Sequence, residues 1–386
     1  MPRSTHPVLS QRALNRATLA RQLLLERASG LDAAQALERI GGAQAQEPAS
    51  PYLALWTRLA DFDPADLHEA FTSRRAIKAS LMRITLHAVS ADDYLALLPT
   101  LLPMFRATGA MRRGTPRPPN VLELAAAAAA FSATPRRSSE LRDHLARQSG
   151  TATLDTPVWW WVRRHLPMIH VPESGPWSFT RRPLITTASA WLGDPSLDDG
   201  GAVPLEAARV HTVRRYLAAF GPATTADLSA WTGVSASDFR DAVAALDADE
   251  ALVRFRDEAG RTLLDLADAP RPAEDVPAPP RILPMWDSVL LAYRDRTRVI
   301  SDEDRLRVVS RNGDVLPTFL VDGVVAGFWW AEPDGAGTRI VIEPFGRLGR
   351  TARRALEAEA DRLASFVGPR EPAVYARYRE SGARRR

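Results

Sequence analysis

Apolar residues recur every three or four positions in several N-terminal segments, a spacing typical of helices with one buried face. Polar caps and glycines mark where these segments begin and end: Asp32 and Ser50 can cap helices, and Gly41-Gly42 can end one. Residues 1–10 carry no such pattern, and we expect them to form a loose arm. The expected helices cover residues 14–28, 33–40, 51–59 and 64–71.

The period changes to two at residues 83–88, where Arg83, Thr85 and His87 alternate with apolar residues. This alternation predicts a strand with those three side chains on one face, and residues 76–80 are its expected partner strand. Helices followed by a two-stranded ribbon are typical of a winged helix, which is a helix-turn-helix unit with a hairpin attached.

The same order of elements recurs twice more after a proline-rich linker at residues 112–120. The second set of expected elements is helices at 121–131, 138–145 and 156–161, then strands at 168–171 and 177–180. The third set is helices at 210–220, 225–231 and 235–246, then a hairpin of 252–255 and 261–266. A second proline-rich linker leads to a strand-rich region at 282–346 and a last amphipathic helix at 350–366.

These patterns predict an α+β fold of three tandem winged-helix modules followed by a β-rich C-terminal part. The expected boundaries are 11–111, 118–195, 205–268 and 281–368, with a tail at 370–386. Winged helices in tandem favour nucleic acid as the partner, although a fold alone does not separate binding from catalysis.

The basic residues are almost all arginine: of 50 basic residues, Lys78 alone is lysine, and the net charge is +4. A G+C-rich genome explains this bias, while arginine also suits phosphate and guanine edges. Schiff-base chemistry would require Lys78 or the N-terminal amine. With a single lysine we expect no efficient strand-cleaving lyase step.

Several classes of protein are excluded by what the sequence lacks. The chain has no cysteine, which excludes a disulfide scaffold and a thiolate metal site. Its seven histidines show no HExxH spacing, so we expect neither a metal nor another cofactor. No apolar run is long enough to span a membrane, and the N-terminus lacks the apolar core of a signal peptide. We expect a monomeric cytoplasmic protein associated with the nucleoid.

Several stretches occur together in an order that resembles one family. They are Leu14-Asn15-Arg16, Gln22-Leu23-Leu24-Leu25, Gly42-Ala43-Gln44-Ala45-Gln46-Glu47-Pro48, Leu81-Met82-Arg83-Ile84-Thr85-Leu86-His87, Leu283-Pro284-Met285-Trp286-Asp287, and Val321-Asp322-Gly323. In this order they are similar to the AlkZ-like winged-helix DNA glycosylases over nearly the whole chain.

The resemblance implies a C-shaped protein that binds double-stranded DNA on its concave side. It also implies excision of N7-alkylated purines and, in some members, unhooking of interstrand crosslinks. The family's catalytic motif is Gln, an apolar residue, and Gln, which matches Gln44-Ala45-Gln46. Ile84 stands where glycine is common in the family.

Two glutamines suit this chemistry because the lesion is already cationic. An N7-alkylguanine leaves as a neutral base, so no general acid is required, and orientation of a water molecule can supply much of the rate. A glutamine offers one acceptor oxygen and two donor hydrogens, but it removes a proton poorly. On an extended segment Gln44 and Gln46 would project to one face. Their alternative role is to cap backbone groups near Gly41-Gly42.

Other candidates have structural alternatives. Arg83, Thr85 and His87 are expected to contact the DNA backbone or the abasic sugar, or else to form a polar face of the wing. Glu47 should point away from Gln46 if the segment is extended.

Three further features are also open. Trp159-Trp160-Trp161 can stack on bases, but at least one of them must face inward on a helix. We expect Asp287, Asp295 and Arg296 to form an ion-pair network. The turn at Asp322-Gly323 is a candidate probe of a DNA groove.

The sequence therefore favours a monofunctional DNA glycosylase that uses Gln44 and Gln46 and leaves an intact abasic strand. Two rivals remain open. One is a non-enzymatic winged-helix DNA-binding protein, either a regulator or a shield over damage. The other is a protein-binding scaffold, favoured by acidic Asp238 and Asp241 on the third expected recognition helix.

Overall fold

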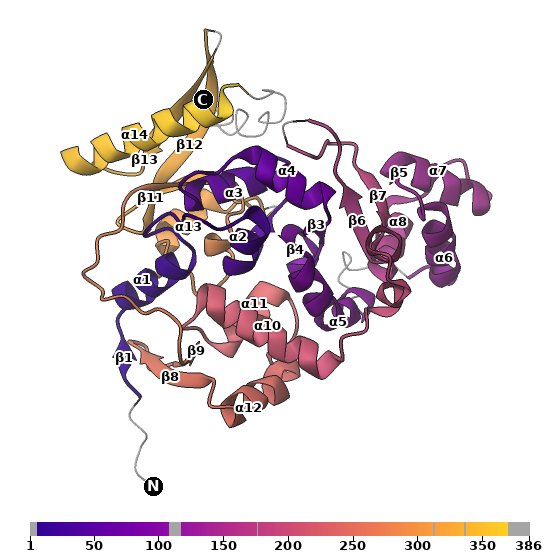
Figure 1. The fold of residues 1–386 in the computed structure, drawn as a ribbon, viewed down its shortest axis with the longest axis horizontal. Coiled ribbons are helices and arrows are strands. Elements are labelled where there is room, and N and C mark those ends of the chain that lie inside the picture. The colour runs from indigo at the N-terminus through magenta and orange to yellow at the C-terminus, as the bar shows by residue number, and fades with distance from the viewer. Residues whose placement is uncertain (1–5, 108–116, 176, 312, 336, 370–386) are drawn as a thin grey trace.

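The computed structural model describes residues 6–107, 117–175, 177–311, 313–335 and 337–369. The predicted tail at 370–386 and part of the predicted linker at 112–120 lie outside these residues. Helices and strands are both present, in the order shown in Figure 1.

The N-terminal helices follow the sequence signals in part: the predicted cap Asp32 is confirmed, but the N-cap of α3 is Ala49, so Ser50 lies inside the helix and does not cap it. Asp32 forms a capping box with Gln35 at the start of α2, and Pro51 lies in the first turn of α3. Gly42 lies in the turn after α2 with a φ of +85°, and a Cβ there would lie 2.8 Å from Val89 Cγ1. The helices are α1 (Gln11–Arg21), α2 (Ala33–Arg39), α3 (Ser50–Arg58) and α4 (Pro64–Thr72).

A six-stranded sheet joins the first two predicted ribbons. Its order is β2-β4-β3-β6-β7-β5, and the strands β3 and β6 pair antiparallel, with Lys78 opposite His170. The strands are β2 (Ala43–Gln44), β3 (Ala76–Ser80), β4 (Leu86–Ser90), β5 (Arg136–Arg137), β6 (Met168–Val171) and β7 (Leu184–Thr187). The two ribbons are therefore joined edge to edge in one sheet.

The predicted strand at residues 83–88 begins later than its alternation suggests. Residues Met82–Ile84 form a 3₁₀ turn in which Arg83 and Ile84 have φ values of +56° and +58°. The Thr85 N–H donates to the Met82 carbonyl, which closes this turn between β3 and β4. Arg83, Thr85 and His87 therefore do not share one face of a strand. The left-handed φ of Ile84 is a conformation that glycine adopts without strain and a β-branched residue rarely adopts.

The second region contains helices α5 (Ala91–Ala107), α6 (Val121–Phe131), α7 (Ser138–Gln148), α8 (Thr156–His165) and α9 (Ala188–Leu192), with a 3₁₀ turn at Pro195–Asp199. On α8, Trp159 and Trp161 are buried and Trp160 is 43% exposed. The strand predicted at 177–180 is wrong, because Trp177 and Phe179 turn inward. These rings pack edge-on against Tyr52 and Phe71.

The third region has helices α10 (Leu205–Phe220), α11 (Thr225–Thr232) and α12 (Arg240–Ala248), a 3₁₀ turn at Ala236–Phe239, and strands β8 (Leu252–Asp257) and β9 (Thr262–Leu266). Strand β1 (Val8–Leu9) pairs parallel with β8. The expected loose arm is thus partly wrong, since this sheet edge offers hydrogen bonds that no local pattern reveals.

The C-terminal part contains β10 (Arg281–Leu283), a 3₁₀ turn at Ser288–Leu290, α13 (Asp302–Val308), β11 (Thr318–Val321), β12 (Val324–Asp334), β13 (Gly337–Pro344) and α14 (Arg350–Val367). The turn between β11 and β12 packs against α1: Arg12 and Arg16 bind Asp322, and Asn15 Nδ2 donates to the Gly323 carbonyl at 2.8 Å. The structure therefore ties this turn to α1 instead of presenting it as a probe.

Two large hydrophobic cores hold these regions together. One core combines α2, α3 and α4 with the C-terminal sheet and α14. The other combines β3, β4 and α5 with α10, α11 and α12. In Figure 1 the N-terminal helices accordingly lie between the C-terminal sheet and the third region. Among the described residues, no helix is both long and apolar enough to cross a membrane.

Candidate active site

The glutamine motif lies on the edge of the six-stranded sheet. Gly41 and Gly42 turn the chain out of α2, and β2 then pairs with β4 so that Gln44 lies opposite His87. The Ala45 N–H continues this pairing by donating to the Leu86 carbonyl at 2.7 Å. Beyond Ala45 the chain bends. Gln44 is consequently buried, whereas Gln46 is exposed.

Both amides are oriented by donors, one from the turn before β4 and one from the first residue of β4. The Arg83 guanidinium donates from Nη2 to Gln44 Oε1 at 3.3 Å. The Leu86 N–H donates to Gln46 Oε1, also at 3.3 Å. Because both partners are donors only, they fix which amide atom is the oxygen. Each NH₂ group therefore points away from these partners, and each oxygen keeps a second lone pair.

Arg83 connects this site to the third region. Its Nη1 donates to the Trp231 carbonyl at 2.6 Å, at the end of α11. Burial, with a smaller effect of Arg296, lowers the pKa of Arg83 to about 10. The guanidinium therefore remains charged at neutral pH and holds a positive charge beside Gln44.

His87 and Thr85 donate hydrogen bonds to backbone carbonyls of the turn before β4. His87 is 1% exposed, and its Nδ1–H donates to the Thr85 carbonyl at 2.9 Å. Burial first, and then the charge of Arg83, lowers the pKa of His87 to about 3, so the imidazole is neutral at pH 7. The Thr85 hydroxyl donates to the Met82 carbonyl at 3.0 Å. The structure brings all three predicted residues together, but it does so through a turn.

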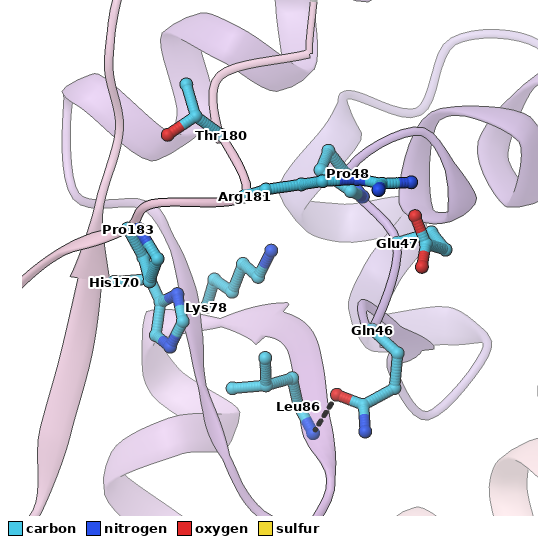
Figure 2. A pocket seen from close by; sticks show the side chains of 9 residues that line it. All are labelled: Gln46, Glu47, Pro48, Lys78, Leu86, His170, Thr180, Arg181 and Pro183. Atoms are coloured by element: carbon cyan, nitrogen blue, oxygen red, sulfur yellow. Dashed lines mark hydrogen bonds between the residues drawn. The ribbon is translucent and has the colours of Figure 1, made fainter. Parts of the chain in front are cut away.

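A polar cavity of about 400 Å³ opens beside Gln46. It falls within the range of ligand pockets in proteins. Figure 2 shows the side chains that line it, which come from three separate parts of the chain. They are Gln46, Glu47, Pro48, Lys78, Leu86, His170, Thr180, Arg181 and Pro183. Gln44 is not among them.

Glu47 lies on this cavity together with Gln46, which corrects the expected opposite orientation. The reason is the bend at residues 46–47, where the extended geometry ends and the turn into α3 begins. Glu47 is 7% exposed. A buried carboxylate therefore borders the same space as the exposed amide.

Lys78 and His170 reach the cavity from paired positions of β3 and β6. Lys78 is 3% exposed, and its Nζ lies 4.3 Å from the centroid of the Phe179 ring. Burial lowers the pKa of Lys78 to about 7, partly opposed by Glu47. Sequence reasoning did not place either residue at the site. The available signal was that Lys78 is the single lysine of the chain.

The expected network of Asp287, Asp295 and Arg296 is wrong. Asp287 instead binds Arg58 through both carboxylate oxygens, at 2.9 and 2.8 Å, and Asp295 binds Arg261 at 2.7 Å. Next to Asp287, the Ser288 hydroxyl donates to the Gly42 carbonyl at 3.0 Å. The buried pair of Arg58 and Asp287 therefore holds Ser288 where it can bond to the chain just before Gln44.

Within the described ranges, no group of three or more histidine and carboxylate side chains could hold a metal ion. The polar groups of the site are amides, one carboxylate, one amine, the imidazole of His170 and arginines. These groups can orient water or a sugar and can stabilise charge that develops nearby.

Comparisons with known proteins agree with this architecture. The DNA glycosylase AlkZ of Streptomyces sahachiroi has a similar fold, with a TM-score of 0.71 and 23% sequence identity. The similarity covers 92% of this chain and 96% of that protein, and it confirms the mixed α+β fold. The search of curated proteins found no match. The sequence model of the family described as DNA glycosylase AlkZ-like matches residues 37–366. The chain therefore belongs to the AlkZ-like family of DNA glycosylases, whose substrate is DNA.

Proposed function

We propose that the protein is a monofunctional glycosylase that excises cationic N7-alkylated purines from double-stranded DNA. The observation that supports this most directly is the placement of Gln46. Its amide is exposed, its oxygen is oriented by the Leu86 N–H, and it borders a polar cavity of about 400 Å³. Gln46 could hold a water molecule there against the anomeric carbon, or could hold the deoxyribose itself.

The proposed reaction needs orientation and charge stabilisation more than acid catalysis. The alkylated base carries a positive charge and departs as a neutral molecule, while the sugar acquires oxocarbenium character. Gln46 would hold the attacking water. Gln44 is buried beside the cavity-lining segment, and its hydrogen bond from Arg83 would keep the segment that carries Gln46 in place. The carboxylate of Glu47 would favour the cationic sugar.

Arg83, Thr85 and His87 are proposed to contact the DNA backbone or the abasic sugar. Arg83 and Thr85 are half-buried and reach the surface in part. His87 is neutral, so its contribution would be a hydrogen bond rather than an ion pair with phosphate. Because it is 1% exposed, that contact requires the turn at Met82–Ile84 to shift.

The larger arrangement belongs to the same proposal. Three winged helices in tandem would form a C-shaped monomer that holds duplex DNA on its concave side. Crosslinks at N7 of purines carry the same positive charge, so unhooking them would use the same chemistry. The protein would act on nucleoid DNA in the cytoplasm.

The test is a duplex that carries one N7-methylguanine, incubated with wild type and with Gln46→Ala. We expect the variant to lose about a hundredfold in the single-turnover rate, the loss typical when one oriented donor is removed. Gln148→Ala is the matched control, because Gln148 is an exposed glutamine at the end of α7. The product should be an intact strand that breaks only after alkali.

Two outcomes would contradict the proposal. Unchanged excision by Gln46→Ala would remove Gln46 from the mechanism. A wild-type protein that leaves every cationic lesion attached, and instead prefers a DNA sequence, would be a regulator.

A further inference from the structure

The single lysine of the chain lies at an unusual position for a lysine. Lys78 belongs to β3, a central strand of the six-stranded sheet, and is 3% exposed. All other basic positions of this sequence carry arginine. An arginine would keep its charge at neutral pH, whereas a lysine can lose it when it is buried. The one amine side chain therefore occurs where the fold buries it.

The Lys78 side chain extends into the cavity beside Gln46 (Figure 2). Within the described part of the chain, its Nζ makes no hydrogen bond and no ion pair. Its close contact is the face of the Phe179 ring, 4.3 Å away. The amine is consequently held in place by packing while its nitrogen remains open to a ligand.

The neighbouring residue on β6 adds a second open group. His170 lies directly opposite Lys78 in the sheet, lines the same cavity and is 6% exposed. Its Nε2 is buried and has no hydrogen-bond partner among the described residues. Burial, Lys78 and Arg163 all lower the pKa of His170 well below its ordinary value, so this imidazole is neutral. Such a neutral group can form a hydrogen bond with a bound molecule, although it takes up a proton poorly.

We infer that Lys78 forms a reversible imine with the abasic product of the proposed reaction. The inference rests on the proposed function, because water attack directed by Gln46 leaves C1′ of the sugar at this cavity. In its open-chain form that carbon is an aldehyde. Lys78 and Gln46 line the same cavity, so one carbon could serve both steps.

The chemistry balances without a further reactant. The Nζ lone pair forms a bond to C1′, the C=O π bond breaks, and the aldehyde oxygen takes up the proton that Nζ gives up. The resulting carbinolamine loses water to give the imine. Addition of water reverses both steps, returns the amine and leaves the DNA strand intact. Burial makes the step available at neutral pH, since a pKa of about 7 leaves about half of Lys78 as free amine.

The inference is tested with a duplex that contains a preformed abasic site and with sodium borohydride, which reduces an imine to a stable amine. Wild type should give a covalent protein–DNA adduct, and peptide mass analysis should place it on Lys78. Lys78→Arg keeps a basic side chain, and Lys78→Met keeps a buried one. Both should lower the adduct yield at least tenfold, and Lys78→Met should unfold in urea near the wild-type midpoint because it buries no unpaired charge.

The absence of cysteine allows a rescue experiment. In Lys78→Cys, alkylation with 2-bromoethylamine rebuilds an amine at this position alone. Protein that mass analysis shows to be fully alkylated should regain the adduct, while untreated Lys78→Cys should not. Recovery of the adduct excludes a purely structural role for Lys78.

The adduct overturns the inference if it persists in Lys78→Arg, since the N-terminal amine would then be responsible. Absence of an adduct in wild type also overturns it. Because the abasic site is preformed, this result is independent of base excision, which the N7-methylguanine duplex reports separately. Strand breakage without alkali would contradict the monofunctional reaction but not the imine.

Discussion

The buried ion pair between Arg58 and Asp287 allows a sharp test of how the site is supported. Both side chains are 1% exposed, and the two hydrogen bonds measure 2.8 and 2.9 Å. The substitution Asp287→Asn keeps the size of the side chain. It replaces one acceptor oxygen by an NH₂ group that faces an Arg58 donor, and it leaves a buried guanidinium without its counter-charge.

The expected cost follows from that geometry. Removing one partner of a buried pair typically destabilises a protein by about 3–5 kcal/mol. For a urea m-value of about 3 kcal/mol/M, the unfolding midpoint should fall by about 1 M or more. The matched control is Asp32→Asn, because Asp32 pairs with Arg75 at 2.9 Å while both side chains are over 40% exposed. Asparagine caps a helix as well as aspartate does, so the control should cost less than about 1 kcal/mol.

Urea unfolding followed by circular dichroism and by tryptophan fluorescence measures both variants. Equal midpoint shifts for Asp287→Asn and Asp32→Asn would refute the reasoning. A second variant, Arg58→Met with Asp287→Leu, removes both charges. It should be more stable than Asp287→Asn, because no unpaired charge stays buried.

Two further predictions concern backbone strain and pH. Gly323→Ala should lower the melting temperature by several degrees more than Gly260→Ala. Both glycines have φ near +80°, so the backbone strain is the same. A Cβ at Gly323 would lie 2.4 Å from Asn15 Oδ1, whereas a Cβ at Gly260 would have no atom within 4 Å. Equal shifts in a thermal melt would show that the contact with α1 is not restrictive. His87 has a folded pKa of about 3 and an ordinary value of 6.5, so the unfolded chain binds the extra proton and stability should fall as pH drops from 6.5 toward 3. His87→Gln should flatten this dependence by up to about 1.4 kcal/mol per pH unit, and parallel urea midpoints at pH 7, 5.5 and 4.5 would contradict that pKa.

Local capping chemistry made several elements predictable from sequence. The helix expected at 51–59 is Ser50–Arg58, the helix expected at 64–71 is Pro64–Thr72, and the strand expected at 76–80 is Ala76–Ser80. Asp63 caps α4, and Pro51 and Pro64 lie in the first turns of α3 and α4, where a missing N–H is tolerated. Agreement within one residue follows, because nothing distant competes with the local preference.

Long-range contacts account for the elements that were not predicted. Arg83 lies in a tight turn and bonds to the Trp231 carbonyl, a partner far away in sequence. Period-two alternation also cannot tell which edge of a ribbon will pair with another ribbon. The pairing of β3 with β6 was therefore not predictable from the sequence, and neither was the position of Lys78 opposite His170.

The candidate site was predictable only as far as its motif. Gln44 and Gln46 were identified through the resemblance, and their roles remain predictions. The cavity was not predictable, because its lining comes from the bend after β2, from β3 and β4, and from β6 and the segment before β7. A single sequence carries no signal for that convergence, apart from the lone lysine.

Electrostatics links the two proposals for this cavity. A cationic lesion would be repelled by a fixed positive charge at position 78, yet an imine requires an amine there. A buried lysine with a pKa of about 7 meets both needs, since it can approach the lesion uncharged and present a lone pair afterwards. Arginine at this position would retain its charge and could not form the imine. The one departure from an arginine-only sequence thus falls where a removable charge is required.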